Sequence, residues 1–268
     1  MGHERISEFE NSIKTKMGAA FGGERVVYRG HDLHHELGDM DWMDFYVYGI
    51  TGKRYSKPIM ELLNYFWVCT SYPDPRIWNN RIVSLAGASR ATGTQALSAG
   101  LMTSEAGIYG HRLSVKAVDF YQRLEKAVAK GNDVEGFVKT EMRIKRIIPG
   151  FGRPMANGDE RVPAAVRKIE SLGLDNGECY KLCFEVEKVV LKNWRMKMNI
   201  VSLGAAKITD LGFSPTQYLM FMYPCHLAGM TMGYSEALEN PEGGVFPVRC
   251  SSLVNTGDHS FKTWSEGK

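Results

Sequence analysis

The sequence has few cysteines, little net charge and no long apolar run, and each absence narrows the class of protein. Its five cysteines are scattered and odd in number, so we expect reduced thiols and no disulfide framework. The 33 basic and 30 acidic residues leave a net charge of +3, which indicates neither a nucleic-acid nor a membrane-surface partner. No apolar stretch reaches the roughly 18 residues of a membrane span, and the first residues show no basic-then-apolar leader. A soluble cytoplasmic protein is therefore expected.

The main positive signal in the sequence is the helical spacing of its apolar residues. A chain of 268 residues is long enough for a large domain with a smaller one beside it. The segments 114–144 and 163–195 carry apolar residues at helical spacing, and polar linkers interrupt each of them. Cys179 and Cys183 share a helix face, but a zinc site needs two more ligands. Helix packing is the preferred interpretation of that pair, and no metal site is predicted.

The most informative stretch is the loop 146–163, which concentrates glycines, prolines and charges between two helical segments. Gly150 and Gly152 allow positive φ or a close approach of the backbone to a ligand. Pro149 and Pro154 fix where the chain enters and leaves the turn. By composition alone, a binding loop and an ordinary interhelical loop are equally good interpretations.

The order of residues in this loop resembles the citrate synthase family. Pro-Gly-Phe-Gly, a short polar run and then Asp-x-Arg are similar to that family's PGFGH…DPR segment, which closes over a CoA thioester and an oxo-acid. Arg153 stands where the family has a histidine, and Arg161 matches a carboxylate-binding arginine. The resemblance implies that Arg161 grips a carboxylate with its guanidinium fork and that Arg153 stabilises an oxyanion.

The resemblance continues in order over residues 28–257. Residues 28–30, Tyr-Arg-Gly, followed by a Glu-Leu pair are similar to the family's YRGYPIEEL turn and helix, with Leu33 and Leu37 on one helix face. A metal site on the neighbouring histidines is an alternative for which no completing carboxylate is evident. The small residues of 77–107 predict closely packed helices.

Three positions depart from the family pattern at its site. Tyr72 is the nearest side chain that could replace a family histidine which helps to hold the oxo-acid. His111 lies in the segment that matches the family's PLHGGA loop, one residue late, and a lone loop histidine is otherwise a surface residue. Val201 stands where the family has the aspartate that removes the α-proton, and a valine cannot act as a base.

The apolar segment 216–238 resembles the family's Arg-x-x-Gly-x-x-x-His-x-x-Glu helix. His226 stands in place of the arginine, and His226 and His111 are the histidines expected to move a proton. Pro224 is expected to kink or divide this helix. Arg249 is loosely similar to a family arginine that reaches into the partner subunit's site, although an arginine on a solvated tail is an equally good interpretation.

Taken together, the resemblance implies an all-α, citrate synthase-like fold. Residues 1–112 and 211–268 would form a large helical domain, and residues 113–210 a small one. The expected activity is C–C bond formation or cleavage on a small-molecule carboxylate, with a CoA thioester as a candidate co-substrate and no cofactor. A homodimer is expected because 77–106 and 216–238 carry more small and apolar surface than a monomer covers. Because the family's base is absent, a noncatalytic dimeric binding or regulatory relative is the alternative.

Overall fold

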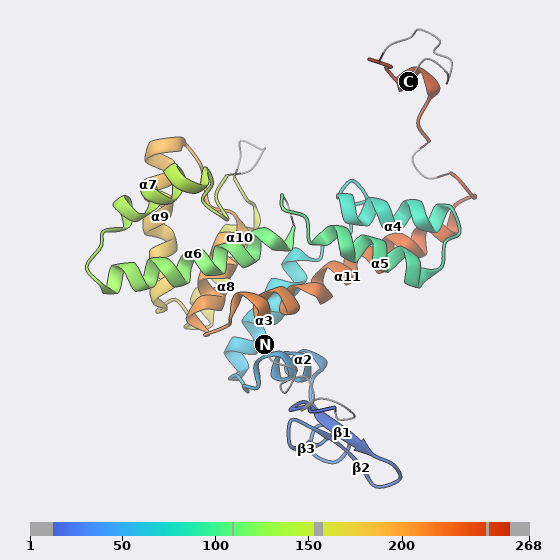
Figure 1. Cartoon of the computed structure of the whole chain (residues 1–268), viewed down its shortest axis with the longest axis horizontal. Helices are drawn as coiled ribbons and strands as arrows, with labels where there is room; N and C mark the ends of the chain where they lie inside the picture. The colour runs from blue at the N-terminus through green and yellow to red at the C-terminus, as the bar shows by residue number, and fades with distance from the viewer. Residues whose placement is uncertain (1–12, 109, 153–157, 245–246, 258–268) are drawn as a thin grey trace, which may run out of the picture.

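The computed structural model describes residues 13–108, 110–152, 158–244 and 247–257, which fold into helices with one small sheet (Figure 1). The predicted all-α class is confirmed. The helices are α2 (Trp42–Thr51), α3 (Lys57–Thr70), α4 (Trp78–Ala88), α5 (Gly93–Ser104), α6 (His111–Ala129), α7 (Val134–Lys145), α8 (Arg161–Ser171), α9 (Glu178–Trp194), α10 (Ile200–Asp210), α11 (Pro215–Glu239) and the 3-10 helix η1 (Cys250–Ser252). Within the described ranges, no helix is both long and apolar enough to cross a membrane.

Helices α6 to α10 gather at one end of the molecule, and α4 and α5 lie at the other beside the last turns of α11 (Figure 1). Small residues let α4, α5 and α11 pack closely, as the sequence predicts. A Cβ on Gly100 would lie 2.4 Å from Val83 Cγ2 and 2.5 Å from Met230 Sδ, so only glycine fits there. The division into domains 1–112 with 211–268 and 113–210 stays a prediction.

The two periodic segments each form two helices, and the breaks fall at the predicted linkers. In α6, Phe120, Tyr121 and Leu124 are fully buried, which accounts for the apolar stripe in its sequence. The chain then turns at Gly131, whose φ is 88°, and Asp133 caps α7 by accepting a hydrogen bond from Gly136 N at 2.7 Å.

A three-stranded antiparallel sheet precedes the helices, with strands β1 (Gly18–Phe21), β2 (Arg25–Tyr28) and β3 (His31–Asp32) in that order. The tight turn between β2 and β3 places Arg29 at φ 48° and Gly30 at φ 89°. The expectation of a helix carrying Leu33 and Leu37 is wrong, because these residues lie in turns. The Asp32 carboxylate accepts the N–H groups of His34 and His35, each at 2.9 Å, and so stabilises a turn instead of a helix.

Helix α11 continues through Pro224, so the proline does not divide the helix, and the kink that was the other expectation stays a prediction. A proline leaves the carbonyl four residues earlier without its helical donor. Here Tyr46 Oη of α2 donates to that carbonyl, Met220 O, at 2.7 Å, and Trp67 Nε1 of α3 donates to Phe221 O at 2.7 Å. Side chains of two neighbouring helices thus satisfy the carbonyls around the proline.

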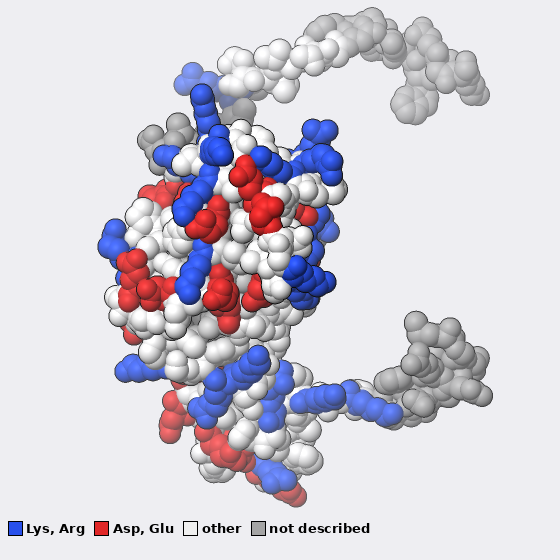
Figure 2. Space-filling view, turned by 90° about the vertical axis from the view of Figure 1, so that its left-hand side faces the viewer, with Lys and Arg blue, Asp and Glu red and all other residues white. Residues whose placement is uncertain are grey.

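Charges of both signs are interspersed over the end of the molecule shown in Figure 2. Lys139 pairs with Glu135 at 2.7 Å along α7, and Lys188 pairs with Glu185 at 2.6 Å along α9. Such exposed pairs contribute little to stability. This face therefore presents a mixed charge pattern, in agreement with the balanced composition.

Candidate functional site

A cavity of about 560 Å³ lies where the ends of several helices meet, within the range of small-molecule sites. Its wall combines the end of α3, the starts of α4, α6, α8 and α10, the middle of α11 and the loop 147–152. Four of the six predicted site residues line it: Tyr72, His111, Arg161 and His226. The fold thus brings together side chains that are far apart in the sequence.

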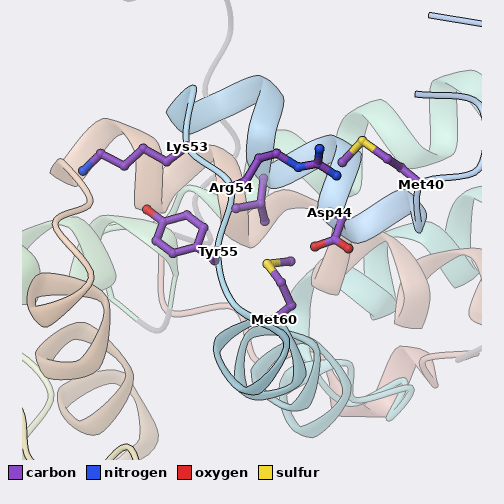
Figure 3. Close-up of a pocket in the computed structure, with 7 residues that line it drawn as sticks. Met40, Asp44, Lys53, Arg54, Tyr55 and Met60 are labelled. Atoms are coloured by element: carbon purple, nitrogen blue, oxygen red, sulfur yellow. The ribbon is translucent and has the colours of Figure 1, made fainter. Parts of the chain in front are cut away.

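A second pocket, between α2, the following loop and α3, holds only about 60 Å³. Figure 3 shows Lys53 extending away from the Asp44 carboxylate, while Arg54 extends toward Met40. The volume suits one or two water molecules rather than a substrate. The larger cavity is therefore the candidate site.

The loop 147–152 is clamped against the start of α10. Gly150 has φ 82°, and a Cβ there would lie 2.5 Å from Ser202 N. The Gly150 carbonyl accepts Asn199 N at 3.0 Å, and Gly152 N donates to Lys197 O at 2.9 Å. Glycine is therefore needed at this position, as predicted, because the backbone takes a positive φ and lies close to a neighbouring segment.

Asp159 and Arg161 form a buried ion pair beside this clamp. Arg161 donates from Nε to Oδ1 and from Nη2 to Oδ2 of Asp159, both at 2.8 Å, and Oδ2 also accepts Ile200 N at 2.9 Å. Burial pushes the pKa of Asp159 upward, but the bonds to Arg161 and the backbone outweigh it and hold the pKa below its usual value. The guanidinium therefore reaches the cavity with its charge already balanced.

Tyr72 covers Arg161 at the end of α3. The guanidinium carbon lies 5.1 Å from the centre of the Tyr72 ring, and Tyr72 Oη donates to Glu160 Oε1 at 2.8 Å. Burial and the bond to Glu160 raise the pKa of Tyr72 to about 12. Tyr72 is thus a neutral hydroxyl on the wall, in agreement with a binding role rather than a proton-transfer role.

His111 is the first residue of α6 and is 1% exposed. Neither of its ring nitrogens has a hydrogen-bond partner in the part of the chain that the structure describes. Burial, and then the neighbouring charge of His226, lower the pKa of His111 to about 3. The imidazole is therefore neutral near pH 7, with one N–H donor and one acceptor nitrogen.

His226 lies against His111, with ring centres 4.1 Å apart. Its Nδ1 is 3.4 Å from Met222 O and 3.3 Å from Cys225 Sγ. Because a carbonyl only accepts, Nδ1 carries the proton and Nε2 is left as an acceptor. Burial lowers the pKa of His226, so this nitrogen is unprotonated near neutral pH, while burial raises the pKa of the Cys225 thiol to about 12.

Sequence reasoning missed two asparagines at the start of α4. Asn79 Nδ2 donates to Ser104 Oγ at 3.1 Å, but Asn79 Oδ1 has no partner among the described residues. Asn80 Nδ2 donates to Tyr72 O at 2.6 Å and so holds the turn that presents Tyr72. The only sequence signal was an adjacent polar pair at the head of an otherwise small-residue helix.

Two predicted site residues, Arg153 and Arg249, are not among the described residues that line the cavity. Arg153 lies outside the described residues. Arg249 is exposed on the C-terminal segment before η1 and does not line the cavity, so its predicted role in a partner subunit's site stays a prediction. Val201 does line the cavity, and the described wall contains no aspartate or glutamate. No cluster of three His, Cys, Asp or Glu fits a metal in the described ranges.

Three solved structures share this architecture. Citryl-CoA lyase from Hydrogenobacter thermophilus superposes with a TM-score of 0.82 at 18% identity over 95% of this chain and 98% of that chain. ATP citrate lyase from Methanothrix soehngenii, in complex with citrate and coenzyme A, superposes with a TM-score of 0.69 at 17% identity over 100% of this chain and 46% of that chain. Citrate synthase from Thermotoga maritima superposes with a TM-score of 0.65 at 14% identity over 84% of this chain and 60% of that chain.

These likenesses show the fold, and the predicted citrate synthase-like architecture is confirmed. No protein-family model matches the sequence, and no curated protein matches it significantly.

Proposed function

We propose that this citrate synthase-like chain binds a small-molecule carboxylate and a CoA thioester in the cavity and makes or breaks a C–C bond between them. The observation that carries the proposal is the pair of buried polar groups without partners among the described residues, the His111 ring and Asn79 Oδ1. Buried polar groups are normally satisfied, so their presence on a cavity wall favours a ligand that completes them. An ATP citrate lyase of this fold holds (3S)-citryl-CoA, a ligand of this class.

A β-hydroxyacyl thioester offers what these groups lack. Its hydroxyl donates a hydrogen bond to Asn79 Oδ1 or His226 Nε2, and its thioester carbonyl accepts one from the neutral His111. In the cleavage direction, His226 Nε2 takes the hydroxyl proton as the C–C bond breaks and the hydroxyl carbon becomes a ketone. The bonding electron pair moves to the thioester as an enolate, whose oxygen His111 N–H stabilises. His226 then returns the proton to the enolate carbon, and synthesis is the reverse.

A noncatalytic binding or regulatory role is the second candidate. Val201 stands on the wall where the resemblance places the family's base, and no carboxylate replaces it among the described lining residues. A protein that had lost turnover could keep a neutral donor and a guanidinium for ligand binding. The two candidates share the ligand and differ only in whether it reacts.

Turnover and binding assays on the same variants separate them. We expect purified protein to cleave citryl-CoA or a related β-hydroxyacyl thioester, and His111→Ala to abolish cleavage. His35→Ala, at an exposed position in the turn after β3, is the matched control and should leave the rate unchanged. Calorimetric binding without turnover supports the second candidate. Failure to bind citrate, oxaloacetate and acyl-CoAs contradicts both.

A homodimer is part of the proposal. Met102 of α5 is 78% exposed and Met232 of α11 is 52% exposed, which suits helices that meet a second copy. If Arg249 completes the neighbour's site, Arg249→Ala should weaken carboxylate binding about tenfold while sedimentation still shows a dimer. A monomer at micromolar concentration would rule this arrangement out.

A further inference from the structure

The starts of four helices line the cavity. The lining residues include Asn79 and Asn80 in the first turn of α4, His111 in that of α6, Arg161 in that of α8 and Ile200 in that of α10. The first N–H groups of a helix have no partner within the helix, and the helix dipole adds a partial positive charge there. Each of these starts is therefore able to stabilise a negatively charged oxygen.

Three helix starts in the protein hold a carboxylate of the chain itself. Asp159 accepts Arg161 N of α8 at 3.1 Å and Ile200 N of α10 at 2.9 Å. Asp210 of α10 accepts two N–H groups in the first turn of α9, at 2.8 and 3.1 Å. In each case the carboxylate satisfies backbone donors and interacts favourably with the helix dipole.

The starts of α4 and α6 are also buried but hold no such group. Asn79 and Asn80 are each 2% exposed, and His111 is 1% exposed. No side chain of the described residues caps either helix. Asp74, which precedes α4, instead accepts the backbone N–H and the guanidinium of Arg76, at 2.8 and 2.7 Å. Buried helix starts without a partner are unusual, so these two favour a ligand that fills them.

The His111 ring points to a ligand at the same place. It lines the cavity, and neither ring nitrogen has a partner among the described residues. The ring is neutral near pH 7, so it offers one N–H donor beside the backbone donors of its own helix. A Cβ on Gly110, the N-cap of α6, would lie 2.5 Å from Ser104 O, so this position has no room for a capping side chain.

We infer that the first turns of α4 and α6, together with the His111 N–H, form an oxyanion site for the thioester oxygen when that oxygen carries negative charge as an enolate. This inference rests on the proposed function, because it concerns the same cavity. It adds backbone donors and two helix dipoles to the single donor of His111. Donors that are fixed before the reaction are well suited to stabilise developing charge. The site thus holds an external oxyanion as Asp159 is held at the starts of α8 and α10.

Calorimetry with two CoA thioethers of the same shape tests the inference. Carboxymethyl-CoA carries a carboxylate in place of the enolate, and carbamoylmethyl-CoA carries a neutral amide. We expect the carboxylate to bind about tenfold more tightly, because helix starts and charge-assisted hydrogen bonds favour the anion.

A variant at the N-cap of α4 locates that preference. Ile77 lines the cavity and has the extended backbone of an N-cap, with φ −68° and ψ 131°. Ile77→Asn gives α4 a side-chain cap without changing the charge of the cavity, so the preference for the carboxylate should fall to about threefold. Ile77→Leu, which cannot cap, is the matched control and should keep the tenfold ratio.

Amide NMR of the unmodified protein is an independent measurement of the same site. Carboxymethyl-CoA should shift the N–H signals of Asn79, Asn80 and His111, and carbamoylmethyl-CoA should shift them much less. Shifts that are confined to Arg161 would place the carboxylate at the guanidinium and overturn the inference.

The outcomes separate this inference from the proposed function. Equal affinity for the two thioethers, or a ratio that is unchanged in Ile77→Asn, would overturn the inference and leave the proposed function standing. Failure of both thioethers and of citryl-CoA to bind would overturn the proposed function and the inference with it.

Discussion

Two walls of the cavity differ in how their polar groups are satisfied. On the wall built from loop 147–152, Asp159 and the start of α10, the carboxylate and the clamping amides have partners within the protein. On the wall built from α4, α6 and α11, the His111 ring and Asn79 Oδ1 have none among the described residues. A satisfied polar network holds the backbone in one geometry, whereas unsatisfied buried groups lower stability until a ligand pairs with them. The first wall is a framework, and the second is where binding chemistry resides.

The largest effect should follow from breaking the framework wall at its ion pair. Asp159→Asn leaves Arg161 mostly buried without its counter-charge and weakens the bond to Ile200 N. We expect a loss of about 3–5 kcal/mol in the free energy of unfolding by urea titration. Glu135→Gln, which removes an exposed pair with Lys139, should cause no measurable change. Equal losses in the two variants would contradict the framework role.

A smaller effect should follow from a methyl group in the clamped loop. Gly150 and Gly158 have nearly the same backbone, with φ 82° and φ 80°. Alanine at either position should lower the free energy of unfolding by about 1–2 kcal/mol, because its side chain disfavours the left-handed backbone conformation. At Gly150 the new Cβ also lies 2.5 Å from Ser202 N, whereas at Gly158 it meets only Lys197 Cδ at 3.4 Å. Gly150→Ala should therefore be more destabilising by about 1–3 kcal/mol in the same titration, and similar losses would refute the clamp.

The smallest effect on stability at pH 7 should come from the second wall. His111→Leu replaces an unsatisfied buried ring by an apolar group, so the unfolding free energy should change by less than about 1 kcal/mol while ligand binding is lost. The pH dependence should change more. The pKa of His111 falls from 6.5 to about 3 on folding.

As the pH falls below 6.5, the unfolded chain takes up a proton at His111 that the folded protein does not. The free energy of unfolding therefore decreases toward acid by up to about 1.4 kcal/mol per pH unit. Above pH 6.5 the His111 ring is neutral in both states, and this loss of stability is absent. His111→Leu should remove this part of the slope between pH 6 and pH 5. Parallel stability curves for the two proteins would show that His111 is not held neutral.

The sequence predicted the helices and most of the cavity because both depend on local patterns. The spacing of apolar residues located α6 to α9. The glycines of loop 147–152 could be predicted because only glycine lets the backbone come so close to another segment. Tyr72, His111, Arg161 and His226 were found by order along the chain, and the fold places all four on one cavity.

What the sequence could not predict depends on tertiary partners. The balance of Arg161 by Asp159 and the unpaired Oδ1 of Asn79 exist only once distant segments meet. The sequence predicts that Pro224 kinks or divides its helix, and it cannot show that the Tyr46 hydroxyl of another helix replaces the missing donor and lets the helix continue. The short strands of 18–32 are set by turns and pairing, with too few residues for a period-2 pattern to emerge.

The most direct test of the central claim is nitrogen NMR of the histidine rings in the free and ligand-bound protein. The account predicts that the His111 ring stays neutral from pH 7 to pH 5. It also predicts that one of its nitrogens shifts strongly when citryl-CoA is added. A His111 ring that titrates near pH 6.5, or whose nitrogens do not respond to any carboxylate or CoA thioester, would contradict it.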